Sequence, residues 1–163
     1  MKKLFLLLAL IGIYSIGCAQ RPQNENEKKT QFRSSFDTNF TYLNSLVATK
    51  ASIFAVILVS FNGSGKIKDI KFSDGAPPKF ISEIIRIKDK VDFKSMYDEL
   101  GGNTSDMQVL IPVQIDALQM AGGGVPIAQK DLDNMYLFKG QPLTGEFVFY
   151  PAINYKYHYN NYE

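Results

Sequence analysis

Two successive apolar runs in the first half of the chain predict a β-hairpin. The run Ala51–Phe61 (ASIFAVILVSF) is apolar at nearly every position and rich in β-branched residues, which predicts a strand buried on both faces. Asn62-Gly63-Ser64-Gly65 follows, and its glycines and asparagine tolerate the positive φ of a tight reversal. In the next strand, 66–72, Ile67 is out of phase with the later apolar residues. We therefore expect a β-bulge near Lys68 and Asp69.

Helical spacing of apolar residues marks two further segments. Pro78 opens a segment in which proline is tolerated because the first turn needs no N–H at that position. This segment carries a broad apolar stripe and an i,i+4 pair of Lys79 with Glu83 on the opposite side. The stripe is formed by Phe80, Ile81, Ile84, Ile85, Ile87 and Val91. An earlier, shorter amphipathic helix is predicted from Phe36, Phe40, Leu43 and Val47.

Alternation of period two predicts the remaining strands. From Met107 to Ile115 every second residue is apolar, which indicates a strand with one buried face. Pro112 lies inside this strand and has no N–H to donate, so we expect either an edge strand or a locally unpaired position. The segment from Gly145 to Tyr159 predicts one or two C-terminal strands interrupted at Pro151.

These elements predict an α+β fold. We expect an antiparallel sheet with a β-β-α-β core, one main helix packed on it, an N-terminal helix and C-terminal strands. The proposed domain spans residues 32–163, which is long enough to bury one hydrophobic core.

The start of the chain has the layout of an exported bacterial protein. Lys2 and Lys3 precede an apolar run that ends at Gly17, which is shorter than the ~20 residues a transmembrane helix needs. Residues 1–17 are therefore predicted to be a signal peptide. Ser15-Ile16-Gly17-Cys18 resembles a lipobox, in which the cysteine carries diacylglycerol and becomes the mature N-terminus. Cleavage after Ala19 would instead give a soluble periplasmic product.

The lone cysteine and the polar stretch after it fit a membrane anchor. Cys18 is the single cysteine of the chain, so no internal disulfide can form. Residues 18–31 lack large apolar side chains and are predicted to be a flexible tether. Such a protein would lie in the cell envelope, and we expect an outer-membrane lipoprotein that faces the periplasm.

Charge and motifs exclude several functions. Without Lys2 and Lys3 the basic side chains equal the 16 acidic ones, so the mature chain carries no net charge and no nucleic-acid partner is expected. The single histidine, His158, has no cysteine or histidine cluster near it in sequence, which disfavours zinc. Asp131-Leu132-Asp133-Asn134 lacks the glycine and terminal glutamate of a calcium loop. Gly63-Ser64-Gly65-Lys66 lacks the outer residues of a phosphate-binding loop. We expect no cofactor, no metal and no enzymatic activity.

The C-terminal tail is rich in tyrosine. Tyr155, Tyr157 and Tyr159 alternate, so in a strand they share one face. Tyrosine is frequent at protein interfaces and on surfaces that stack against sugars. These three residues are candidates for partner binding, although a role in covering the sheet is an open alternative.

The segment from residue 51 to residue 115 resembles the C-terminal domain of the TonB family. The likeness rests on Ile57-Leu58-Val59-Ser60-Phe61, on Gly65-Lys66-Ile67-Lys68-Asp69-Ile70, on the helix at Pro78, and on Leu110-Ile111-Pro112-Val113-Gln114-Ile115. It implies a helix packed across a twisted antiparallel sheet, and binding of an extended partner segment by pairing at a sheet edge. The chain lacks tryptophan, a long proline-rich spacer and an uncleaved membrane helix, so we do not expect an ordinary energy transducer.

The sequence therefore predicts a non-enzymatic envelope lipoprotein that binds a protein or peptide. Its candidate contacts are Val109, Ile111 and Val113 on the expected edge strand, with the tyrosine face beside them. A protein that binds or cleaves glycans through tyrosines and paired carboxylates is one alternative. A structural subunit of an envelope assembly is another.

Overall fold

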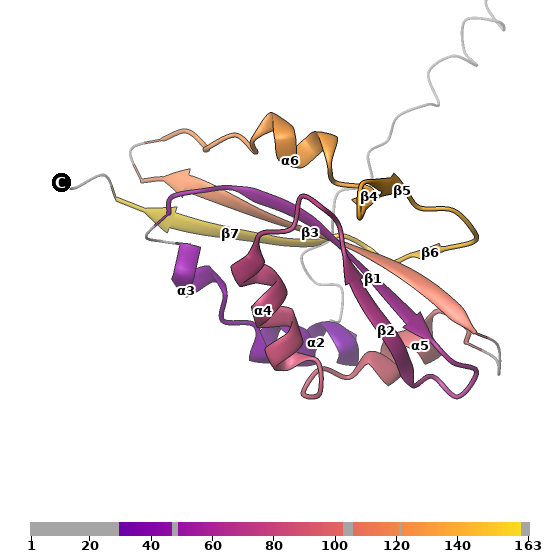
Figure 1. The fold of residues 1–163 in the computed structure, drawn as a ribbon. Helices are drawn as coiled ribbons and strands as arrows, with labels where there is room; N and C mark the ends of the chain where they lie inside the picture. The colour runs from indigo at the N-terminus through magenta and orange to yellow at the C-terminus, as the bar shows by residue number, and fades with distance from the viewer. Residues whose placement is uncertain (1–29, 47–48, 103–105, 121, 161–163) are drawn as a thin grey trace, which may run out of the picture.

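The computed structural model describes residues 30–46, 49–102, 106–120 and 122–160, and it shows a mixed α+β architecture. A five-stranded sheet is ordered β2-β1-β3-β6, with β7 also paired to β3. Helices α2 to α5 cover one side of this sheet, and α6 lies on the other side with the small strands β4 and β5 (Figure 1). The α+β class is therefore confirmed. The signal peptide, Cys18 and the tether up to residue 29 lie outside the described residues.

The two central strands are β1 (Ile53–Phe61) and β3 (Met107–Gln119), which pair antiparallel from Ile53 opposite Ile115 to Phe61 opposite Met107. Strand β1 is buried on both faces, as its unbroken apolar run predicts. Strand β3 buries alternate residues, which matches the predicted alternation.

Strand β2 (Ile67–Phe72) completes the predicted hairpin. In the turn, Asn62 Oδ1 accepts hydrogen bonds from the Ser64 and Lys66 amides, and Gly65 has a φ of 76°. Ser60 lies opposite Asp69 whereas Phe61 lies opposite Ile67, so the intervening Lys68 has no partner. The predicted bulge is confirmed at this residue.

The prediction that β3 is an edge strand is wrong, and so is the prediction of a purely antiparallel sheet. Beyond β3 lie β6 (Val148–Phe149) and β7 (Ile153–Tyr159), and both run parallel to it. Parallel pairing is possible because the long connection 120–147 carries the chain back to the start of β3. Pro112 lies between the segment of β3 that pairs with β6 and the segment that pairs with β7. On this side of β3 it is therefore unpaired, which was the second possibility that its missing N–H left open.

Four helices enclose the main core against one face of the sheet: α2 (Gln31–Asn39), α3 (Leu43–Leu46), α4 (Pro78–Ile87) and α5 (Phe93–Glu99). Thr30 caps α2, so the domain begins two residues before its expected start at residue 32. Helix α4 begins at Pro78 as predicted, with Phe80, Ile84 and Ile87 buried, whereas Ile85 is exposed.

The apolar spacing predicts one continuous N-terminal helix, but the described residues form two short helices, α2 and α3. Helix α2 ends before Phe40, whose backbone is extended, and α3 begins at Leu43. The amide of Thr41 donates to Glu83 of α4 rather than to a helical carbonyl. The break lets both Phe40 and Tyr42 pack against Phe80, at ring-centroid distances of 6.1 and 5.6 Å.

A smaller core covers part of the opposite face. It joins Val56, Leu58, Leu110 and Phe138, and it lies under α6 (Gln129–Asp133), β4 (Leu137–Phe138) and β5 (Gln141–Pro142). The carboxylate of Asp74 holds this layer in place by accepting hydrogen bonds from the amides of Lys139 and Gly140, at 2.8 and 2.6 Å.

Candidate functional site

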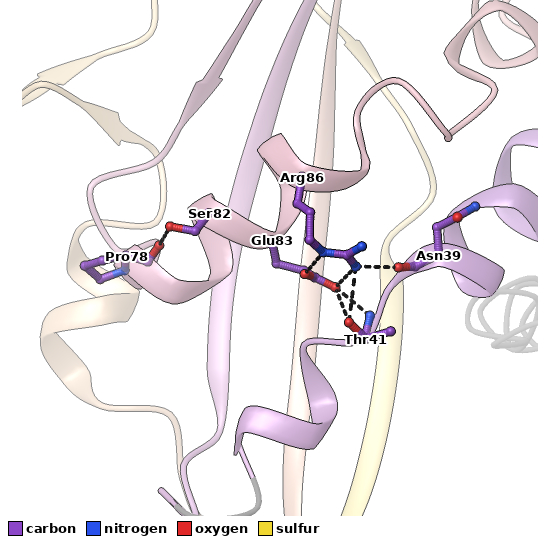
Figure 2. A network of polar contacts seen from close by, with 6 residues as sticks. All are labelled: Asn39, Thr41, Pro78, Ser82, Glu83 and Arg86. Carbon is purple, nitrogen blue, oxygen red and sulfur yellow. Dashed lines mark hydrogen bonds and ion pairs between the residues drawn. The ribbon is translucent and has the colours of Figure 1, made fainter.

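A shallow groove of about 490 Å³ lies between α4 and the α2–α3 connection. Its lining consists of Thr41, Tyr42, Pro78, Lys79, Ser82, Glu83 and Arg86. Glu83 and Arg86 of α4 point across the groove at Thr41 and the end of α2, whereas Ser82 bonds to Pro78 within α4 (Figure 2).

Glu83 is the centre of this network. One carboxylate oxygen accepts from the Thr41 amide at 2.6 Å and from the Thr41 hydroxyl at 2.9 Å. Arg86 donates to both carboxylate oxygens, through Nε at 2.7 Å and Nη2 at 2.8 Å. The same Nη2 reaches the carbonyl of Asn39, the last residue of α2, at 2.9 Å, where a cation also complements the helix dipole.

These contacts make the groove a structural clamp. The hydrogen bonds from Arg86, together with those from Thr41, lower the pKa of Glu83 to about 2 despite its burial. A general acid would need a raised pKa instead. In the described part of the chain, no buried side-chain nitrogen or oxygen lacks a hydrogen-bond partner. In the groove, Thr41, Glu83 and Arg86 are bonded to one another.

The histidine and the aspartates weighed for metal chemistry lie on different elements. His158 is exposed on β7, and Asp131 and Asp133 belong to the short helix α6. No group of three or more histidine, cysteine or acidic residues with the geometry of a metal site occurs among the described residues. Nor does any described helix have the length and apolar character needed to span a bilayer.

Among the described residues, no strand pairs with the outer side of β7. The carbonyl of Tyr159 accepts from the Met120 amide at the end of β3, so the backbone of Tyr159 is directed at β3. Backbone direction alternates along a strand, which turns the N–H and C=O groups of Asn154, Lys156 and His158 away from β3. These groups have no hydrogen-bond partner among the described residues. We call these three residues and their outward backbone groups the β7 edge.

The other sheet edge is protected. Strand β2 carries Lys68, Asp69 and Lys71 at exposed positions, and Lys68 forms the bulge. Charged side chains and bulges are the usual features that prevent an edge strand from pairing with another chain. The β7 edge is longer, has no bulge in its pairing with β3, and carries one lysine.

The predicted contact residues of β3 are not available to a partner. Val109, Ile111 and Val113 are all fully buried in the main core, on the face covered by the helices. They alternate as predicted, but their strand is central, so both its side chains and its backbone are already engaged.

The tyrosine tail does not form an open surface either. Tyr155, Tyr157 and Tyr159 share one face of β7, as their alternation predicts, but this face is the one under the helices. Tyr157 and Tyr159 are buried, and the Tyr157 hydroxyl donates to the carbonyl of Ala51 at 3.0 Å. Tyr155 is half-buried and stacks on Phe40 at 5.1 Å. The open alternative, in which these tyrosines cover the sheet, describes the structure.

The β7 edge was not predicted from the sequence, although a signal for it was present. The polar residues Asn154, Lys156 and His158 alternate with the tyrosines, which marks a strand with one solvent-facing side. The pairing of Glu83 with Arg86 was not predicted either, since the i,i+4 spacing favoured Lys79. The lipidation residue Cys18 lies outside the described part of the chain.

No family model, no curated protein and no solved structure matches this chain.

Proposed function

We propose that this chain is a non-enzymatic lipoprotein of the cell envelope, and that its domain binds an extended segment of another protein at the β7 edge. The observation that carries the proposal is the row of outward backbone groups at Asn154, Lys156 and His158, which has no partner among the described residues. An incoming strand would satisfy these donors and acceptors and extend the sheet, a mode of recognition that needs no catalytic residue.

The difference between the two sheet edges supports this assignment. Exposed charges and a bulge protect β2, whereas β7 presents a regular edge of seven residues. Helix α2 holds β7 in place, because Asp37 of α2 accepts a hydrogen bond from the Tyr155 hydroxyl of β7. Rigid presentation of the edge lowers the entropic cost of adding a strand.

The sequence supports the envelope location and the mode of binding. The basic start, the apolar run and Cys18 fit an anchor in the outer membrane with the domain in the periplasm. The sequence resemblance of residues 51–115 to TonB C-terminal domains implies binding of an extended segment by edge pairing.

The anchor is tested by mass spectrometry of the mature N-terminus, on protein taken from the membranes of its own host. A diacylated Cys18 supports the proposed attachment. An unmodified chain that starts at Gln20 contradicts it and makes the protein a soluble export product.

The binding mode is tested by photocrosslinking in the same cells. A benzophenone amino acid placed at Asn154 on the β7 edge should give a defined crosslinked product, whereas the same group at Lys68 on the β2 edge should not. His158→Pro removes one outward N–H without removing a bond to β3, so the fold should persist while the product disappears.

Circular dichroism and thermal unfolding of the His158→Pro variant establish that it is folded. A product that forms equally from Lys68, or that survives His158→Pro in a folded protein, would rule out strand addition at β7. A product that contains one fixed set of envelope proteins in constant ratio would instead favour a structural subunit of an assembly.

A further inference from the structure

Cations without carboxylate partners flank the C-terminal half of the β7 edge. Lys156 is exposed on the sheet face opposite the helices, and it forms no ion pair with any described residue. On the other face, the ammonium group of Lys50 lies 5.9 Å from the centre of the Tyr159 ring. His158 is also exposed on this strand.

Two carboxylates on neighbouring elements accept hydrogen bonds from other groups, and that of Asp116 keeps its negative charge because its donor is a neutral amide. Asp116 is the residue of β3 opposite Lys156, and its Oδ1 accepts from the Gln114 amide at 2.9 Å. Asp37 accepts from Arg33 at 2.9 Å and from the Tyr155 hydroxyl at 2.5 Å. Lys156 belongs to the outer strand, whereas Asp116 lies one strand further in, and β7 itself carries no carboxylate.

The other end of the same edge is apolar. In β6, Phe149 is 60% exposed and Val148 is 36% exposed, and both belong to the strand that precedes β7 on the outer side of β3. Phe149 lies beside Leu110 on the face that also carries Lys156. At about 3.3 Å per residue, an extended segment of roughly ten residues would run from Phe149 to His158.

We infer that the β7 edge selects an acidic extended segment of a partner protein. Its carboxylates would lie opposite Lys156 and near Lys50, and an apolar side chain would lie against Phe149. This inference rests on the proposed function and specifies the chemistry of the partner. A second copy of this chain does not fit, because its own outward positions are Asn154, Lys156 and His158 and bring no carboxylate. Pairing two β7 strands about Lys156 would also oppose two ammonium groups.

The test uses two synthetic ten-residue peptides added to the full-length protein. Both have the same alternating threonine and valine sequence with a phenylalanine at one end. One peptide has two glutamates in its second half, and the other has two lysines at the same positions. Affinity is measured by fluorescence anisotropy. Hydrogen–deuterium exchange followed by mass spectrometry reports on the fragments that contain β7.

The acidic peptide should bind about ten-fold more tightly than the basic one and should slow exchange in β7. Lys156→Gln should weaken binding of the acidic peptide by about two- to five-fold, the effect of one solvent-exposed charge pair, and leave the basic peptide unaffected or slightly tighter. The matched control is Lys79→Gln, an exposed lysine on α4 that should change neither affinity.

Each other outcome overturns the inference in a distinguishable way. Equal protection of β7 by both peptides would reject the preference for acidic segments and would still be consistent with strand addition. Strand addition itself is tested by the crosslinking experiment. Slow exchange of the outward amides of Asn154, Lys156 and His158 without any peptide would mean that another segment already occupies the edge. Protection that is independent of protein concentration would assign the edge to the chain's own segment, and protection that rises with concentration would assign it to a second copy. Binding to phosphatidylglycerol vesicles that Lys156→Gln weakens, with no protection of β7, would assign the cations to a membrane surface.

Discussion

The hydroxyl of Tyr155 donates a hydrogen bond to Oδ1 of Asp37 at 2.5 Å, and so joins the last strand of the sheet to the first helix of the domain. Two further tyrosines repeat this relationship. The Tyr150 hydroxyl lies 2.9 Å from Oγ1 of Thr30, the cap of α2, and Tyr157 donates to the carbonyl of Leu46 in α3 at 3.3 Å. The tyrosine tail thus fastens the N-terminal helical segment to the sheet. Phenol side chains suit this role because the ring packs in the core while the hydroxyl reaches a polar group.

Tyr155→Phe is expected to reduce the free energy of unfolding by about 1–2 kcal/mol. The change keeps the stacking on Phe40 but removes a hydrogen bond to a carboxylate that is partly buried. Urea unfolding at pH 7 measures the effect. Tyr136→Phe is the matched control, since Tyr136 is exposed, and it should change the stability by less than about 0.5 kcal/mol.

The same variant has a signature at alkaline pH. Burial, reinforced by the bond to Asp37, raises the pKa of Tyr155 above the usual value near 10. The unfolded chain therefore ionises first, so the contribution of this residue is complete below about pH 10 and is lost as the pH rises further. Unfolding measured from pH 8 to pH 11 should show a smaller loss in Tyr155→Phe than in the wild type. An equal loss would mean that the pKa of Tyr155 is the same in the folded and unfolded chains, which contradicts both its burial and its bond to Asp37.

Local patterns in the sequence were sufficient for the elements near the hairpin. The two-sided apolar run of β1, the glycine turn, the bulge at Lys68 and the start of α4 at Pro78 each depend on residues close together in the chain. The position of β3 in the sheet was not predictable in this way. Strand β7, which pairs with β3 on the side away from β1, lies about 40 residues later in the chain. Alternation of apolar residues indicates which face of a strand is buried, but it does not indicate how many strands lie beside it.

The candidate site was also predictable only where it depends on residues close together in the chain. Alternation correctly placed Tyr155, Tyr157 and Tyr159 on one face, but whether helices cover that face depends on where α2 and α3 pack. The break at Phe40 arises from Glu83, which is 42 residues from Thr41, and no local signal marks it. The free edge follows from the order of the strands, which is a property of the whole sheet.

Glu83→Gln is expected to lower the stability at pH 7 and to flatten its dependence on acid pH. The pKa of Glu83 is about 2 in the folded protein, below that of the unfolded chain. The stability it provides is therefore complete above about pH 5 and is lost as the pH falls toward 2. Its side chain is 10% exposed whereas Arg86 is largely solvent-accessible, so solvent screening limits the effect to about 1–2 kcal/mol.

Urea unfolding at several pH values between 2 and 7 measures this linkage. The wild type should lose more stability across the range than Glu83→Gln, and the two curves should converge at the acid end. Glu146→Gln is the control, because Glu146 is exposed in the loop before β6. Parallel curves for wild type and Glu83→Gln would contradict the clamp between α4 and Thr41.

Ser52→Ala is expected to cost about 2–3 kcal/mol, which is large for the loss of one hydroxyl. Ser52 is buried, accepts from the Ala117 amide at 2.9 Å, and donates to the carbonyl of Val125. Its removal leaves two backbone groups at the end of β3 unpaired inside the protein. Ser82→Ala is the control, since its hydroxyl bonds to Pro78 at the surface and its loss should be nearly neutral. Equal thermal shifts in the two variants would show that solvent reaches the Ser52 site.

Gly102 is expected to be required because a neighbouring side chain leaves no room for a Cβ, and not because of its backbone conformation. A Cβ at this position would lie 2.3 Å from Cε1 of Tyr97, a side chain that is 2% exposed. The ring cannot move away easily, because its hydroxyl donates to the carbonyl of Gly63 and it packs against Phe61 at 5.5 Å. We expect a loss of about 2–3 kcal/mol from overpacking in Gly102→Ala.

The adjacent Gly101 provides the comparison. It has a φ of 79°, and a methyl group added there would meet only open space, so Gly101→Ala should cost about 1 kcal/mol through backbone strain alone. Tyr97→Ala should relieve the cost of Gly102→Ala but not that of Gly101→Ala, because it removes the ring and leaves the backbone unchanged. A double-mutant cycle by urea unfolding should therefore give a coupling of more than about 1 kcal/mol for Tyr97 with Gly102 and near zero for Tyr97 with Gly101. Equal couplings would mean that the loop after α5 moves as a unit and that the ring does not dictate the glycine.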